Sequence, residues 1–166
     1  VVTWESLDFQ PYFTATASNI GYGWWSHDIG GHMLGIRSDV MEARWYELGT
    51  FSPINRLHST KMSFSGKEPW NYPEPYCSDM EKILRFRHAL IPYMYTLNYR
   101  CHCEHIPVII PMYYYYPFEE KAYSYKNQYF LGSEMLVCPV TTKIDEDSQK
   151  SGEECFIPAG IWTDIF

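Results

Sequence analysis

Hydrophobic positions in the first two thirds of the chain alternate between helical spacing and short extended runs. The predicted elements are, in order, a helix over about 4–18, a strand at 24–28, a helix over about 39–48, a strand at 51–58 and a long helix from 78 to about 101. Pro92 lies inside the last helix and should bend it. This alternation is typical of a parallel α/β sheet with helices on its faces.

The pattern changes after Pro107. Short β-prone runs at 108–110, 112–116, 129–130, 135–140 and 155–157 are separated by proline and glycine, and 144–154 is an acidic stretch that predicts an exposed loop. We therefore expect two domains, with residues 1–106 in the α/β part and residues 107–166 beginning an antiparallel sheet. Two predicted strands and three helices are too few to cover both faces of a parallel sheet, so 1–106 predicts only part of a larger one.

The run that ends at Asp28 carries the most suggestive chemistry. Gly30 and Gly31 follow it at once, and the second run ends in Arg56 and His58. Carboxyl ends of parallel strands share one edge of a sheet, where α/β proteins bind ligands, so we expect these polar side chains to meet there. With tryptophans nearby they suit a neutral, polyhydroxylated ligand. A structural Arg56–Asp28 ion pair and a core histidine at 58 are the open alternative.

Charge and composition exclude several classes of partner. The net charge of −7 argues against binding to nucleic acid or an anionic membrane, and no apolar run reaches the roughly 18 residues of a membrane span. The 5 cysteines are odd in number and irregularly spaced, so they predict a reducing compartment, and we expect the cytoplasm.

No metal or other cofactor is predicted. His27 and Asp28 are adjacent on a predicted strand and should point to opposite faces, which disfavours a shared ion, with or without His32. Cys101 and Cys103 lack the spacing of a zinc site. The glycines fit no phosphate-binding loop.

Seven motifs in one order resemble glycoside hydrolase family 31, the α-glucosidase and α-xylosidase family. They are Ser-His-Asp-Ile-Gly-Gly-His at 26–32, Arg-Trp at 44–45 before Gly49, Phe-Ser-Pro…Arg-Leu-His at 51–58, Lys-Glu-Pro-Trp at 67–70, Leu-Ile-Pro-Tyr-Met-Tyr-Thr-Leu at 90–97, the segment 128–140 and the segment 157–164. The resemblance covers essentially the whole chain.

The resemblance implies the fold and the site. The chain is expected to form the last strands and helices of a (β/α)8 TIM barrel, followed by the start of a β-sandwich domain. The family hydrolyses α-glycosides with retention through two aspartates, and neither matches a residue here; both are expected upstream of Val1. The substrate-binding residues implied are Trp25, Asp28, His32, Arg56 and His58. Many members carry Phe or Tyr at the position of His32.

Three hypotheses follow. The first is a fragment of a retaining α-glycosidase, with an α-glucosidase as the leading choice. It binds small-molecule or oligosaccharide substrates and needs the rest of the barrel to complete its site. The second is a non-catalytic carbohydrate-binding module that uses the tryptophan and tyrosine side chains. The third is a purely structural segment without ligand contact.

Overall fold

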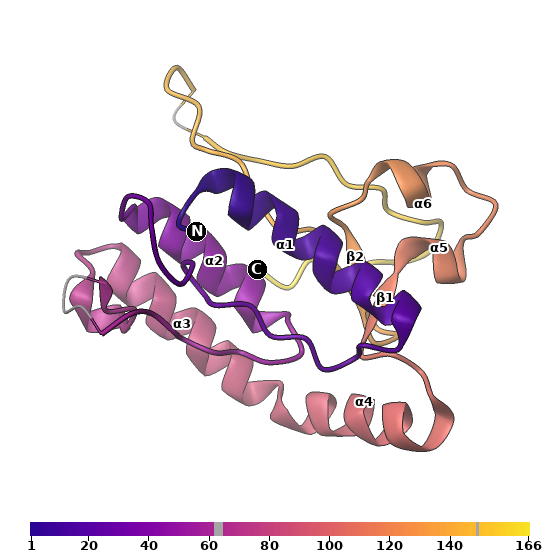
Figure 1. The fold of residues 1–166 in the computed structure, drawn as a ribbon. Coiled ribbons are helices and arrows are strands. Elements are labelled where there is room, and N and C mark those ends of the chain that lie inside the picture. Colours follow the sequence, from indigo (N-terminus) through magenta and orange to yellow (C-terminus); the bar gives the residue numbers. More distant parts are fainter. Residues whose placement is uncertain (62–64, 149) are drawn as a thin grey trace.

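A computed structural model describes residues 1–61, 65–148 and 150–166. Its main elements are α1 (Trp4–Ala17), α2 (Asp39–Thr50), α3 (Tyr76–Ala89), α4 (Ile91–Glu104), β1 (Ile109–Pro111), β2 (Tyr129–Leu131) and β3 (Met135–Val137). Short helices α5 (Met112–Tyr115) and α6 (Lys121–Ser124) lie between β1 and β2, and 3₁₀ turns occur at Ser18–Ile20 and Pro69–Asn71. Figure 1 shows α2 and α3 on the left and the small sheet on the right, with α1 running towards the sheet and α4 below it.

The long helices begin where the sequence offers a cap or a proline. The Thr3 hydroxyl caps α1 by accepting a hydrogen bond from the Ser6 backbone N–H at 3.2 Å. Helix α3 ends at Ala89 and α4 begins at Ile91, so the predicted bend is a break between two helices. Pro92 lies in the first turn of α4, where its missing N–H costs nothing.

The two strands predicted in the first half are reduced to a single residue pair. Ile29 and Leu57 form an isolated parallel bridge, and the Ile29 N–H donates to the Arg56 carbonyl at 3.3 Å. The segments 24–28 and 51–58 are otherwise irregular. A parallel ladder is stable when neighbouring strands extend it and helices cover both faces, and the described residues supply only these two segments at this place.

The predicted antiparallel sheet is present but shorter. Its order is β1-β2-β3, with Ile110 opposite Phe130 and Phe130 opposite Leu136. The β-prone run 112–116 forms α5 instead of a strand, because it is an unalternating tyrosine run between Pro111 and Pro117 that has no partner strand. The run 155–157 is extended without ladder pairing.

One hydrophobic cluster joins the helices to the sheet. Leu7 on α1, Trp45 on α2 and Tyr129 on β2 are buried together within it. Polar contacts cross the same junction: the Ser18 hydroxyl donates to the Ile109 carbonyl at 2.6 Å. The first part of the chain is therefore a set of helices around isolated parallel bridges, packed against a short antiparallel sheet, and this arrangement agrees with the expected last part of a (β/α)8 barrel followed by a sheet domain. No helix among the described residues has both the length and the apolar character needed to cross a bilayer.

Candidate functional site

Asp28 directly precedes Ile29 of the Ile29–Leu57 bridge, and a glycine turn follows at Gly30 and Gly31. The Gly31 N–H donates to the Asp28 carbonyl at 2.8 Å, and Gly30 and Gly31 have φ angles of +79° and +77°. These angles lie in the left-handed region that glycine adopts at little cost. The two glycines thus fix the direction in which the Asp28 side chain leaves the turn.

A buried ion pair between Lys67 and Glu42 contacts this turn at Gly30. The Lys67 ammonium donates to the Gly30 carbonyl at 3.0 Å and to Glu42 Oε2 at 3.1 Å, and both side chains are buried. Burial raises the pKa of Glu42, and the Lys67 charge acts in the opposite direction. Sequence reasoning missed this pair, although Lys67 begins the Lys-Glu-Pro-Trp motif.

Asp28 is shared by two side chains that approach from different segments. The Arg56 guanidinium donates to Asp28 Oδ1, and the His32 Nδ1 lies 3.2 Å from Asp28 Oδ2. The His32 and His58 rings are in contact, with centroids 4.7 Å apart and planes inclined by 36°. Four of the five predicted site residues therefore form one cluster, which combines a carboxylate, a guanidinium and two imidazoles.

The fifth residue, Trp25, lines a cavity of about 300 Å³ together with Asp28, His32 and Arg56. Ser6 and Gln10 of α1 add polar groups to its wall, which sequence reasoning also missed. Trp25 is fixed by the Phe13 ring, with centroids 4.5 Å apart. The cavity therefore has one aromatic wall and several polar ones, an arrangement suited to a sugar-sized ligand.

Two other tryptophans close to these motifs in the sequence, Trp24 and Trp70, lie away from the cavity. They are 53% and 74% exposed, and neither lines the cavity.

His27 also lines the cavity, but both of its ring nitrogens already have hydrogen-bond partners. Trp45 Nε1 donates to His27 Nδ1 at 3.0 Å, and His27 Nε2 lies 2.9 Å from the Ser52 hydroxyl. Because an indole N–H can only donate, Nδ1 is the acceptor and Nε2 carries the proton.

The residue types of this cluster could ligate a metal ion, but the positive charge of Arg56 beside them opposes the binding of a cation. Donor atoms of Asp28, His32 and His58 all lie within 4.8 Å of one another, so the predicted separation of His27 from Asp28 does not by itself exclude an ion. The Arg56 cation, however, already holds one oxygen of the only carboxylate. A bound cation would face this charge at short range, whereas a neutral hydroxylated ligand would accept from Arg56 and donate to Asp28.

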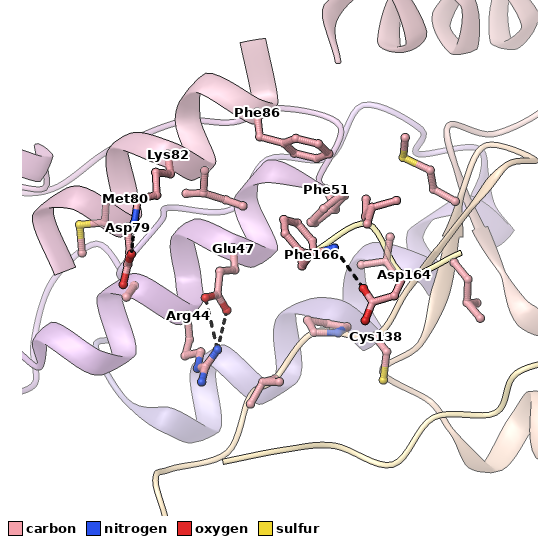
Figure 2. A pocket seen from close by; sticks show the side chains of 18 of the residues that line it. Arg44, Glu47, Phe51, Asp79, Met80, Lys82, Phe86, Cys138, Asp164 and Phe166 are labelled. Atoms are coloured by element: carbon pink, nitrogen blue, oxygen red, sulfur yellow. Dashed lines mark hydrogen bonds and ion pairs between the residues drawn. The ribbon is translucent and has the colours of Figure 1, made fainter. Parts of the chain in front are cut away.

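A larger pocket of about 790 Å³ lies between α2, α3, β3 and the last residues of the chain (Figure 2). The Phe51, Phe86 and Phe166 rings contact one another on one side of it. Four of its charged side chains form ion pairs, Arg44 with Glu47 and Lys82 with Asp79, and Asp164 accepts a hydrogen bond from the Phe166 N–H. It shares no residue with the Asp28 cluster, so the smaller cavity is the candidate functional site.

Helices around a parallel bridge, with one carboxylate, one guanidinium and two imidazoles gathered beside it, are consistent with part of an α/β barrel enzyme. Residues 1–97 match the family profile described as the glycosyl hydrolases family 31 TIM-barrel domain, and residues 105–166 match the family 31 C-terminal domain. The chain belongs to glycoside hydrolase family 31.

Relatives and solved structures agree with this assignment. Neutral alpha-glucosidase C of Mus musculus is 32% identical over 163 residues, which cover 97% of this chain and 17% of that protein. A family 31 alpha-xylosidase from a soil metagenome, solved with xylose, superimposes with a TM-score of 0.76 at 26% identity, over 86% of this chain and 24% of that one. A cycloalternan-degrading enzyme from Trueperella pyogenes gives 0.79 at 26% identity, over 85% and 21%. The chain thus spans about a fifth of the length of such proteins.

Proposed function

We propose that this chain supplies part of the sugar-binding site of a retaining α-glycosidase that hydrolyses terminal α-linked sugars, with an α-glucosidase as the first candidate. The observation that carries the proposal is the sharing of Asp28 between Arg56 and His32 beside a cavity of sugar size. Carboxylate and guanidinium groups in fixed positions recognise vicinal hydroxyls by accepting from one and donating to the next.

In this proposal the chain binds substrate but does not carry out the chemistry. Retaining hydrolysis needs two carboxyl groups about 5–5.5 Å apart, one as nucleophile and one as acid and base. Asp28 is held by a guanidinium, and no residue of this chain matches either catalytic motif of the family. We place both aspartates in the part of the barrel outside these 166 residues, and the boundary between barrel and sheet domain near residue 106.

The test compares the chain with the complete enzyme that contains it. The complete enzyme should hydrolyse p-nitrophenyl α-glucoside, and Asp28→Ala should reduce kcat/KM strongly, while the 166-residue chain alone should release no p-nitrophenol. Hydrolysis by the chain alone would contradict the proposal. Unchanged kcat/KM in the Asp28→Ala enzyme would instead favour a structural segment.

A non-catalytic carbohydrate-binding module is the second candidate, because several large aromatic side chains are exposed. Trp24, Trp70 and Tyr95 are all more than half exposed. Titration of the chain with glucose and maltose separates the two candidates. Binding lost on Trp70→Ala but kept in Asp28→Ala would favour the module, and the opposite result would favour the barrel site.

A further inference from the structure

Two segments flank the acidic loop at a distance from the Asp28 cluster in the sequence. Residues 138–142 leave β3, and residues 152–156 return alongside them in the opposite direction. The Thr142 hydroxyl donates to the Gly152 carbonyl at 3.4 Å, and the Cys138 thiol donates to the Glu154 carbonyl at 3.8 Å. Figure 1 shows the loop between them projecting from the rest of the molecule.

This pairing brings two cysteines to the base of the projecting loop. Cys155 lies between Glu154, which Cys138 contacts, and Phe156, whose N–H donates to Gln128 Oε1 at 2.8 Å. Both sides of Cys155 are therefore tied to the β2–β3 side of the molecule. We propose that Cys138 and Cys155 are a redox-active pair that forms an intramolecular disulfide across the base of this loop.

The two thiols are neighbours in space. The Cys138 side chain contacts the residue that precedes Cys155 and lies within hydrogen-bonding reach of the Cys155 thiol. A disulfide requires such proximity, with Cα atoms about 4.4–6.8 Å apart. Both thiols are free, Cys155 exposed and Cys138 partly buried. Burial, and then the neighbouring Cys155 thiol, raise the pKa of Cys138 to about 12, which agrees with two thiols in close proximity.

The different exposure of the two thiols sets the order of the steps. With a disulfide oxidant such as oxidised glutathione, the Cys155 thiolate attacks one glutathione sulfur, breaks the S–S bond and releases one glutathione thiolate. Cys138 then loses its proton to solvent and attacks Cys155 Sγ, which releases the second glutathione. Two protein thiols are oxidised and one glutathione disulfide is reduced to two thiols, so atoms and electrons balance. The raised pKa of Cys138 makes the second step slow at neutral pH.

The cross-link would lie close to hydrogen bonds that connect both flanks of the loop to α1 and α2. The Thr141 hydroxyl donates to Asp8 of α1 at 2.7 Å, and Arg44 of α2 donates to the Ser151 hydroxyl at 2.9 Å. Cys138 also lines the larger pocket, beside Asp164 in Figure 2. Oxidation would thus restrict the movement of one wall of that pocket. It would also restrict the segments 138–142 and 151–156, which connect the sheet to α1 and α2. Neither effect depends on the proposed sugar site.

Peptide mapping tests this directly on the 166-residue chain. The chain is treated with oxidised glutathione, alkylated and digested with trypsin, which separates the two cysteines by cleaving after Lys143 and Lys150. The expected product is the peptide 127–143 joined by a disulfide to the peptide 151–166. Its mass is lower than the sum of the two reduced peptides by two hydrogen atoms, and dithiothreitol should separate it into the two peptides. Each of these peptides contains one cysteine. Cross-linking should become faster as the pH rises.

Matched variants and a denatured control complete the test. Cys138→Ser should leave a glutathione adduct on Cys155 that persists, whereas Cys103→Ser, which removes an exposed thiol on α4, should leave the 138–155 link intact. In concentrated guanidinium the same oxidation should give a mixture of pairs. Three results would overturn the proposal. They are glutathione adducts without a cross-link, a different dominant cysteine pair, and the same mixture of pairs with and without guanidinium.

Discussion

The His32 imidazole and the Asp28 carboxylate lie on either side of the Gly30-Gly31 turn, with Nδ1 and Oδ2 3.2 Å apart. The turn itself brings them together, because its left-handed glycines fold the chain back on itself within four residues. Arg56 reaches the other carboxylate oxygen from a segment that is distant in sequence. Asp28 is therefore positioned by one local contact and one long-range contact.

The first prediction concerns Asp28 in the complete enzyme. Asp28→Asn keeps the shape of the side chain but removes the charge that Arg56 and a sugar hydroxyl both use. Hydrogen bonds to charged groups are worth about 1.5–3 kcal/mol, so kcat/KM for p-nitrophenyl α-glucoside should fall by about 10- to 100-fold. Asp39→Asn is the matched control, because Asp39 also pairs with an arginine but lies outside the cavity. Equal losses in the two variants would contradict the role of Asp28.

The second prediction concerns His32 and the leaving group. His32→Phe keeps a ring against His58 but removes the Nδ1 contact to Asp28. We expect the ratio of kcat/KM values for maltose and p-nitrophenyl α-glucoside to change by about 3- to 10-fold, the equivalent of about 1 kcal/mol at the rim of the site. His102→Phe, an exposed position on α4, should leave this ratio unchanged. A constant ratio in His32→Phe would remove His32 from the substrate-contacting set.

The sequence was sufficient to predict the helical segments, though not the complete break between α3 and α4, and the meeting of Asp28 with Arg56. Helical spacing is a local property, and Thr3 provides a local cap for α1. The proximity of Asp28 and Arg56 followed from a general rule, that parallel strands end at a common edge. This rule needs only the direction of two segments, and the single Ile29–Leu57 bridge satisfies it.

The remaining features depend on contacts that no local pattern encodes. Whether 112–116 becomes a strand depends on a partner strand, and without one it forms α5. The Lys67–Glu42 pair links residues from two segments that the sequence gives no reason to pair. The assignment of His27 likewise required its partner Trp45, since a lone histidine in the sequence is compatible with either a ligand or a core residue.

The third prediction concerns the glycine turn. A Cβ on Gly30 would lie 1.9 Å from Glu42 Oε2, so Gly30→Ala must displace the carboxylate from Lys67 and also place alanine at positive φ. Gly21 has a similar φ of +73° but open space around it. Both variants should lose about 1–2 kcal/mol from the backbone, and Gly30→Ala should lose a further 1–3 kcal/mol or so through the broken ion pair. Urea unfolding measures both, and equal losses would show that Glu42 moves freely.

The fourth prediction is a pH dependence of stability that originates at His27. Burial lowers the pKa of His27 from 6.5 to about 4, with the nearby Asp28 charge opposing the shift. Its Nδ1 is also occupied by the Trp45 N–H, so a proton there would bring two donors face to face. The unfolded chain therefore binds a proton that the folded chain does not between these pH values, and stability falls as the pH falls from about 6.5 to 4.

The size of this effect makes it measurable. The shift corresponds to about 3 kcal/mol less stability at pH 4 than at pH 8 from this residue. The measurement is the free energy of unfolding in urea at a series of pH values. His27→Gln should be less stable at pH 8, because hydrogen bonds to Trp45 and Ser52 are weakened, but should lose this part of the pH dependence. His102→Gln should keep the wild-type slope, because His102 is exposed. An unchanged slope in His27→Gln would assign the acid sensitivity to other groups.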